Sequence, residues 1–293
     1  MPASPSRRAL LTAGLLAPVL SSCSALGVFN AVTPADSGAR LAAEGVSYGP
    51  DPRHKLDVFV PDESAGARAA KRRPVALFIY GGSWNSGARA DYAFVGRALA
   101  ARGIVTVVMD YRLVPQVRYP GFVEDGALAT RWVKSEIGRF GGDPARLFIM
   151  GHSAGAYSAA MLALNPAFTR DVGLRGAPYR GLVGLAGPYD FYPFDVGAAR
   201  EAFGQWPRPQ ETQPVSIARR GAPPAFLAYG TEDTTVLPRN SRKLAEVLRS
   251  LGTRVVERAY PGVSHAGILL ALSKPLRERA PVLDDVVAFI QGG

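Results

Sequence analysis

The sequence has few of the residues that build metal sites and crosslinks. Its 293 residues include one cysteine and three histidines. A lone cysteine cannot form an internal disulfide, and no Cys/His cluster has the spacing of a zinc site. The formal net charge is +10, yet the arginines are scattered, without a basic stripe with interleaved aromatic residues or a glycine-rich phosphate loop. We therefore expect no metal, no cofactor and no nucleic-acid partner.

Long apolar runs are also lacking. The apolar run near the N-terminus follows Arg7-Arg8 and ends at Leu20, which is too short for a bilayer span of about 20 residues. A basic pair before a short apolar run is typical of an export signal, here with twin-arginine character. The run leads into Leu20-Ser21-Ser22-Cys23, which resembles a bacterial lipobox.

These features predict how the N-terminal part is organised. We expect an export signal over residues 1–22, a lipid attached to Cys23 and a tether over residues 23–44. The protein would then be anchored in a bacterial membrane, at the periplasmic face or in the outer membrane. The alternative is a plain signal peptide cut near Ala25, with an incidental cysteine.

What the chain does contain is a G-x-S-x-G pentapeptide, Gly151 to Gly155. Four apolar residues precede it, and a small-residue stretch with helical composition, residues 154–164, follows it. Strand, sharp turn and helix form the context that presents a serine as a nucleophile. Ser153 is therefore the candidate nucleophile, and an ordinary glycine turn is the alternative.

A serine nucleophile needs a general base, and histidine is the usual one. His152 lies inside the turn, and His54 lies early in the chain, before a predicted strand. His265 follows a predicted late strand and the breaker Pro261-Gly262. We therefore assign His265 as the base, against the alternative of a surface-loop histidine.

The carboxylate that orients the histidine is expected between the serine and the histidine in chain order. Asp233 lies in the loop after the predicted strand 225–229, with Glu232 beside it as a competitor. Asp233 is preferred because its spacing from Gly230 places it past the turn. Its alternative role is an N-cap or an Asx-turn before the next helix.

Acyl transfer also needs backbone N–H groups that stabilise the oxyanion. Ala154, which follows the nucleophile, would supply one of them. Another would come from the loop after the predicted strand 75–80, which reads Gly81-Gly82-Ser83-Trp84. A plain strand-to-helix turn is the alternative reading of this loop.

The chain resembles, over roughly residues 48–290, α/β-hydrolases of the hormone-sensitive-lipase-like, arylformamidase-like and isoprenylcysteine-methylesterase-like group. Four segments carry the resemblance: Tyr80 to Trp84, Asp110 to Pro115, Gly141 to Arg146, and the pentapeptide. The resemblance implies that Gly82 and Ser83 supply N–H groups alongside Ala154. Members of this group usually have histidine where this chain has Tyr80. We expect this difference to change the hydrogen bonds that brace the loop, but not its backbone N–H donors.

The order of apolar and amphipathic segments predicts one α/β domain over residues 45–293, and the resemblance implies that this domain has the α/β-hydrolase fold. It has a mostly parallel sheet with helices on both faces. Strands are expected at 56–60, 75–80, 104–109, 147–150, 181–185, 225–229 and 254–260, and helices at 90–101, 122–140, 154–164, 241–251 and 283–290.

One segment breaks this alternation. Residues 189–223 are rich in aromatic residues and proline, and we interpret them as a small cap that shapes an acyl or aryl pocket. Trp84, Tyr189 and Phe191 are the expected pocket residues. The alternative is a loop that packs its own aromatic side chains into a satellite core.

These predictions favour a serine carboxylesterase that hydrolyses small-molecule esters through an acyl-enzyme. A second hypothesis is an arylformamidase-like amide hydrolase that uses the same triad. A third is a non-catalytic envelope binding protein on a hydrolase scaffold.

Overall fold

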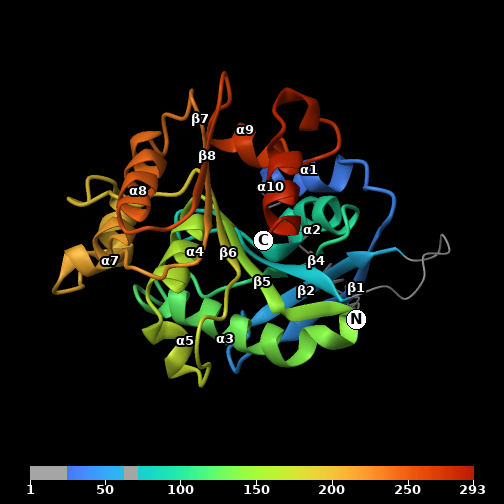
Figure 1. The fold of residues 1–293 in the computed structure, drawn as a ribbon, viewed down its shortest axis with the longest axis horizontal. Helices are drawn as coiled ribbons and strands as arrows, with labels where there is room; N and C mark the ends of the chain where they lie inside the picture. Colours follow the sequence, from blue (N-terminus) through green and yellow to red (C-terminus); the bar gives the residue numbers. More distant parts are fainter. Residues whose placement is uncertain (1–24, 63–71) are drawn as a thin grey trace, which may run out of the picture.

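The computed structural model describes residues 25–62 and 72–293. The expected export signal and Cys23 lie outside the described residues. The described chain forms one twisted sheet between two layers of helices (Figure 1).

The sheet has eight strands in the order β1-β2-β4-β3-β5-β6-β7-β8. β2 pairs antiparallel with β1 and β4, and the other neighbours are parallel. The expected mostly parallel sheet and the α/β-hydrolase fold are thus confirmed. The strands are β1 (Ala39–Ser47), β2 (Lys55–Pro61), β3 (Arg73–Ile79), β4 (Val105–Met109), β5 (Gly142–His152), β6 (Gly181–Leu185), β7 (Ala225–Gly230) and β8 (Val255–Tyr260).

Helices cover both faces of the sheet (Figure 1). One layer contains α2 and α10, which contact each other, and the other contains α3, α4 and α8. The helices are α1 (Ala25–Val32), α2 (Ala93–Ala100), α3 (Gly121–Glu136), α4 (Ala154–Leu164), α5 (Ala167–Asp171), α6 (Gly197–Phe203), α7 (Pro214–Ile217), α8 (Arg239–Ser250), α9 (His265–Leu270) and α10 (Val282–Gln291).

The central strands are continuous apolar runs because helices cover them on both faces. All residues of β4 and β6, and all but the first of β3, are buried. A strand buried in this way has its backbone polar groups paired within the sheet, so its carboxyl end is a rigid platform for loops.

The segment 23–44, expected as a tether, is different in its described part. α1 packs against the domain: the Asn30 side chain donates to the carbonyl of Ala90 at 3.0 Å and accepts from the N–H of Phe94 at 3.0 Å. The Phe29 and Phe94 rings meet edge to face, 5.6 Å apart. β1 begins at residue 39 and forms the edge of the sheet. α1 and β1 are short and show no clear apolar pattern in the sequence, but both pack against other elements of the fold.

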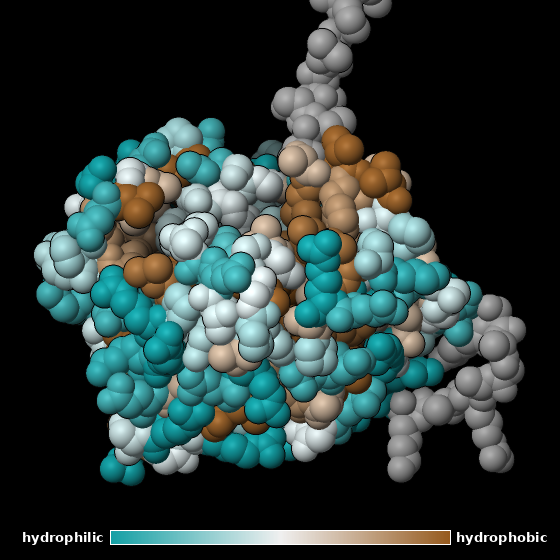
Figure 2. Space-filling model, turned by 90° about the horizontal axis from the view of Figure 1, so that it is seen from above, coloured by the Kyte–Doolittle hydropathy of each residue, from teal (hydrophilic) through white to brown (hydrophobic). Residues whose placement is uncertain are grey.

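α1 remains exposed on its outer side. None of its residues is buried, and Val28 and Val32 are 51% and 73% exposed. Figure 2 shows hydrophobic surface gathered on the side of the molecule where this helix lies. Apolar side chains are therefore exposed to solvent on α1.

The expected cap lies between β6 and β7 and contains α6 and α7. Its aromatic side chains pack on one another and on the domain, as the stacked Phe194 and Phe203 rings 5.6 Å apart illustrate. The cap is therefore an aromatic layer beside the carboxyl edge of the sheet.

Candidate active site

Ser153 lies at the sharp turn between β5 and α4. Its φ of 54° and ψ of −126° lie in a strained region for a residue with a side chain. The flanking glycines make the turn possible, because a Cβ at Gly151 would overlap the backbone of Gly155, and a Cβ at Gly155 would overlap the carbonyl oxygens of Ile79 and Tyr80. The close approach of α4 to β3 therefore depends on glycine.

Ser153, His265 and Asp233 meet beyond the carboxyl edge of the sheet. The Ser153 Oγ lies 2.8 Å from Nε2 of His265, and Nδ1 of the same ring lies 2.7 Å from Oδ2 of Asp233. The three residues come from the ends of β5, β7 and the loop after β8. Since these strands are parallel, their carboxyl ends share one edge of the sheet.

Local structure holds the histidine in place. His265 is the first residue of α9, and the preceding Ser264 caps this helix by accepting the N–H of Gly267 at 3.2 Å. The His265 carbonyl accepts a hydrogen bond from Nε2 of His152 at 3.0 Å. The backbone on which the imidazole sits is thus fixed from two sides.

The Asp233 side chain is buried and forms several hydrogen bonds. Its Oδ1 accepts the N–H groups of Thr235 and Val236 at 2.9 and 2.8 Å, while Oδ2 faces His265. Burial alone would raise the pKa of Asp233, but the bonds from His265 and the two backbone N–H groups outweigh it and lower the pKa. Asp233 therefore forms the Asx-turn of the alternative reading and also holds the imidazole. The competitor Glu232 is exposed.

The other two histidines have different surroundings. Nε2 of His54 pairs with Asp125 at 2.9 Å, far along the sheet from the late loops. Burial and the neighbouring His265 lower the pKa of His152 to about 3. His152 is therefore neutral at physiological pH and serves as a hydrogen-bond donor.

The loop after β3 has an unusual backbone. Gly82, Ser83 and Trp84 have φ angles of 116°, 50° and 62°, all in the left-handed half of conformational space. Gly81 lies against Ser153, since a Cβ there would be 2.9 Å from the Cβ of Ser153. Within the described ranges, no acceptor takes the N–H groups of Gly82, Ser83 or Ala154. Ser83 and Ala154 line the same cavity as Ser153, so their N–H groups stay available there.

A cavity of about 410 Å³ opens at Ser153. Trp84 and Phe191, which the sequence suggested, line it. Further lining comes from residues that no motif indicated, because they meet only through the fold: Tyr192, Pro193, Val196, Val236, Leu237 and Arg239.

Tyr189, also expected in this pocket, does not line it. Its side chain is fully buried, and a Cβ at Gly184 or Gly187 would overlap the Tyr189 ring or hydroxyl. The space that these two glycines leave admits the tyrosine into the core, so its assignment to the pocket is wrong.

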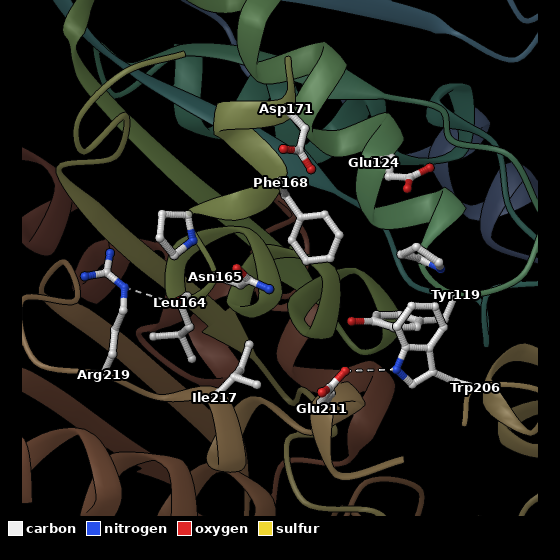
Figure 3. Close-up of a pocket in the computed structure, with 12 residues that line it drawn as sticks. Tyr119, Glu124, Leu164, Asn165, Phe168, Asp171, Trp206, Glu211, Ile217 and Arg219 are labelled. Atoms are coloured by element: carbon white, nitrogen blue, oxygen red, sulfur yellow. Dashed lines mark hydrogen bonds between the residues drawn. The ribbon is translucent and has the colours of Figure 1, made fainter. Parts of the chain in front are cut away.

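Aromatic rings close the cavity at the back. Phe203 of the cap meets Trp84 edge to face at 4.8 Å and Tyr119 at 5.7 Å. Tyr119 in turn lines a second cavity on the far side of these rings, shown in Figure 3. One layer of aromatic side chains therefore separates the two cavities.

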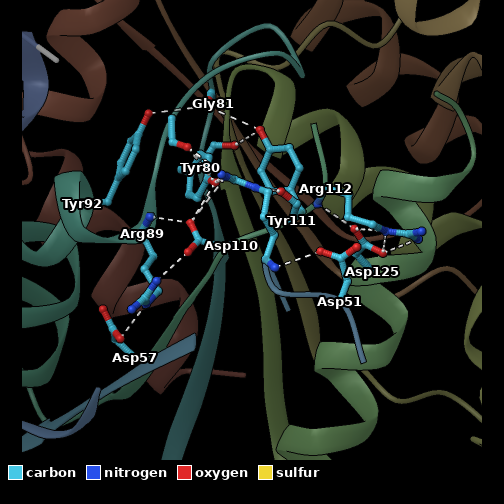
Figure 4. A network of polar contacts seen from close by, with 12 residues as sticks. Asp51, Asp57, Tyr80, Gly81, Arg89, Tyr92, Asp110, Tyr111, Arg112 and Asp125 are labelled. Atoms are coloured by element: carbon cyan, nitrogen blue, oxygen red, sulfur yellow. Dashed lines mark hydrogen bonds and ion pairs between the residues drawn. The ribbon is translucent and has the colours of Figure 1, made fainter. Parts of the chain in front are cut away.

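A polar network holds the loop after β3 from below (Figure 4). The Tyr80 hydroxyl donates to Oδ1 of Asp110 at 2.9 Å and accepts from Nη2 of Arg53 at 2.8 Å. Asp110 also pairs with Arg89 at 2.6 Å, and the Tyr111 hydroxyl donates to the Tyr80 carbonyl at 3.1 Å. Tyr80, Asp110, Arg53 and Tyr111 thus brace this loop together.

Neither a metal site nor a membrane span is found in the part of the chain that the structure covers. In residues 25–62 and 72–293, no group of three or more His, Cys, Asp or Glu side chains is placed to hold a metal ion. No helix within the same ranges has the length and apolar character needed to cross a membrane.

Comparison with solved structures identifies the fold. A truncated carbohydrate esterase from gut microbiota superposes with a TM-score of 0.76 at 20% identity, over 89% of this chain and 98% of that one. Esterase B of Lactobacillus rhamnosis gives 0.77 at 18% identity, over 91% of this chain and 90% of that one. Both are similar in fold to this protein, which confirms its α/β-hydrolase fold.

Curated proteins of similar sequence carry esterase names. A probable isoprenylcysteine alpha-carbonyl methylesterase ICME of Oryza sativa subsp. japonica is 30% identical, over 86% of this chain and 64% of its own length. Esterase LipC of Mycobacterium tuberculosis is 29% identical, over 77% of this chain and 60% of its own length. The chain thus spans less than two thirds of the length of these relatives.

The comparison with protein families covers most of the domain. The family described as BD-FAE matches residues 56–248, which include the strained serine, the loop after β3 and Asp233. The chain therefore belongs to the BD-FAE family.

Proposed function

We propose that this protein is a serine carboxylesterase that hydrolyses small carboxylic esters through an acyl-enzyme. One observation carries the proposal: a continuous hydrogen-bond chain from Asp233 through His265 to Ser153, with bonds of 2.7 and 2.8 Å, ends at an open cavity. The esterase names of the relatives support ester chemistry.

In this mechanism the Ser153 oxygen attacks the ester carbonyl carbon, and Nε2 of His265 takes the hydroxyl proton. When the tetrahedral intermediate collapses, the imidazolium gives that proton to the departing alcohol. Water then attacks the acyl-enzyme with the same proton transfers and releases the acid. Asp233 holds the ring with Nδ1 protonated, so Nε2 is free to accept.

The oxyanion of each intermediate would be stabilised by the free N–H groups of Gly82, Ser83 and Ala154. They come from two loops, and the polar network of Tyr80, Arg53 and Asp110 braces one of them. Preorganised donors stabilise the transition state because they need no reorientation during the reaction.

The cavity supports a small substrate. Its 410 Å³ lies at the small end of ordinary ligand sites, and Trp84, Phe191 and Val236 form the apolar part of its wall. We expect short acyl or aryl groups to be preferred over long chains.

The experiment is a kinetic comparison on p-nitrophenyl esters of increasing acyl length. Ser153→Ala should lower kcat by about 10⁴-fold or more, as removal of a triad member does. Ser158→Ala is the matched control, because Ser158 lies in the same helix and its hydroxyl, among the described residues, bonds only the Ala154 carbonyl, at 3.3 Å. A Ser153→Ala variant that keeps near-wild-type kcat overturns the proposal.

The same residues would support cleavage of an aryl formamide, the second hypothesis. Comparing kcat/KM for a short aryl ester and an aryl formamide decides between the two. For the third hypothesis, a non-catalytic binding protein, a fluorophosphonate probe is decisive, since an inactive site takes up no label.

We also propose export and lipid attachment at Cys23. In support, the described chain begins with α1, whose apolar outer side would lie next to the anchored end. Metabolic labelling with a palmitate analogue should mark the full-length protein but not Cys23→Ser. Equal labelling of both, or of neither, contradicts the anchor.

A further inference from the structure

The second cavity is larger than the catalytic one and has a different chemistry. It has a volume of about 570 Å³ and lies between the start of α3, the end of α4, α5 and the cap. Figure 3 shows its aromatic, acidic and aliphatic side chains around one hollow. The mechanism above uses none of them.

Three aromatic residues form walls that stand at right angles. The rings of Tyr119 and Trp206 are 5.0 Å apart at 87°, and those of Tyr119 and Phe168 are 6.5 Å apart at 83°. Perpendicular rings enclose a compact group on several sides, whereas a flat sugar ring needs a flat stacking surface. Such a cage attracts cations through the negative faces of the rings.

Three carboxylates add negative charge to the same cavity. Glu124, Asp171 and Glu211 all line it. Within the described ranges, the side chains of Glu124 and Asp171 form no hydrogen bond or ion pair. Burial raises the pKa of Glu124, Arg112 opposes this, and Asp125 and Asp171 raise it further. Glu124 and Asp171 therefore lie close enough to repel each other, and a bound cation would relieve that repulsion.

The one cationic residue that lines the cavity forms no ion pair with the lining carboxylates among the described residues. Arg219, the one cationic residue among the lining residues, donates through Nε to the Leu164 carbonyl at 3.1 Å. Glu211 pairs with Arg208 at the exposed rim and accepts from Nε1 of Trp206 at 3.4 Å. Glu124 and Asp171 are thus the carboxylates left to meet a ligand charge.

We propose that this cavity is a second, non-catalytic binding site for a small organic ammonium ion, such as an alkylated or quaternary amine. The aromatic walls hold the alkyl groups, and the carboxylates neutralise the charge. Phe203 separates the site from Trp84 in the catalytic cavity, so both sites can be filled at once.

The test uses choline and its neutral isostere 3,3-dimethyl-1-butanol as probes. Binding to the full-length Ser153→Ala protein is measured by calorimetry and by the fluorescence of its tryptophans. Because the two probes differ mainly in charge, choline should bind at least about tenfold more tightly than the alcohol. Equal affinities overturn recognition of a cation, and the absence of saturable choline binding overturns the site.

Variants then locate the binding. Trp206→Leu keeps an apolar wall but removes a ring, and Asp171→Asn removes charge from an exposed side chain. Each should weaken choline binding by about tenfold or more. Glu44→Gln in the edge strand β1 is the matched charge control and should bind as the parent does. Choline binding that is unchanged in both cavity variants contradicts the assignment, whatever the outcome of the esterase assays.

Discussion

Replacing His152 with glutamine should flatten the acid dependence of stability. His152 is neutral in the folded protein: Nε2 donates to the His265 carbonyl at 3.0 Å, and burial, followed by the charge of His265, lowers the pKa of His152 to about 3. In the unfolded chain its pKa returns to about 6.5. Between these values the unfolded state binds a proton that the folded state does not, so stability falls as the pH falls.

The magnitude follows from the width of this window. Each pKa unit corresponds to about 1.36 kcal/mol. From pH 6.5 to 4.5, His152 should therefore remove about 2 to 3 kcal/mol of unfolding free energy. Glutamine can still donate an N–H to the His265 carbonyl, but it does not titrate.

The assay is urea unfolding of both proteins at pH 6.5 and 4.5. Other titrating groups are common to the two proteins, so the difference between their pH dependences isolates residue 152. The wild type should lose about 2 to 3 kcal/mol more than His152→Gln. Equal losses would show that the His152 ring is protonated in the folded state, against the reasoning from its burial.

Three further substitutions test the site, and a fourth, Glu232→Gln, serves as a control. Asp233→Asn should lower kcat on p-nitrophenyl butyrate by about 10⁴-fold because the amide favours the wrong imidazole tautomer, while Glu232→Gln should leave kcat near the wild-type value. Tyr80→Phe should lower kcat by about tenfold with little change in KM, because it removes the hydroxyl that donates to Asp110 and braces the loop after β3, which we propose supplies two of the oxyanion donors. An unchanged kcat contradicts a role for this brace. Gly155→Ala should lower the Tm by several degrees, because its Cβ would overlap the carbonyls of Ile79 and Tyr80; an unchanged Tm contradicts the tight α4–β3 approach.

Much of the fold could be predicted from the sequence, because buried parallel strands are continuous apolar runs. β3, β4, β6 and β7 lie within a residue or two of the predicted segments. β1 was missed because its residues alternate irregularly and two register shifts interrupt its pairing with β2. α1 was missed because its partners, Ala90 and Phe94, are far along the chain.

The candidate site was likewise predictable in part: the triad residues were, and the pocket walls were not. Chain order and a small number of histidines were enough to nominate Ser153, Asp233 and His265, because each follows a predicted strand. Pocket walls depend on side-chain directions within irregular segments, which no short motif specifies. Tyr189 illustrates this: the same aromatic character suits a pocket or a core, and the space at Gly184 and Gly187 decides for the core.

The most direct test of the central proposal is to detect an acyl group on Ser153. The protein is mixed with a slowly hydrolysed aryl ester, quenched in acid and digested, and the peptides are analysed by mass spectrometry. We expect one acyl group on the peptide that carries Ser153, and none after the Ser153→Ala substitution. Rapid ester turnover with no acyl group on that peptide, or with the acyl group on a different residue, would contradict the proposed mechanism.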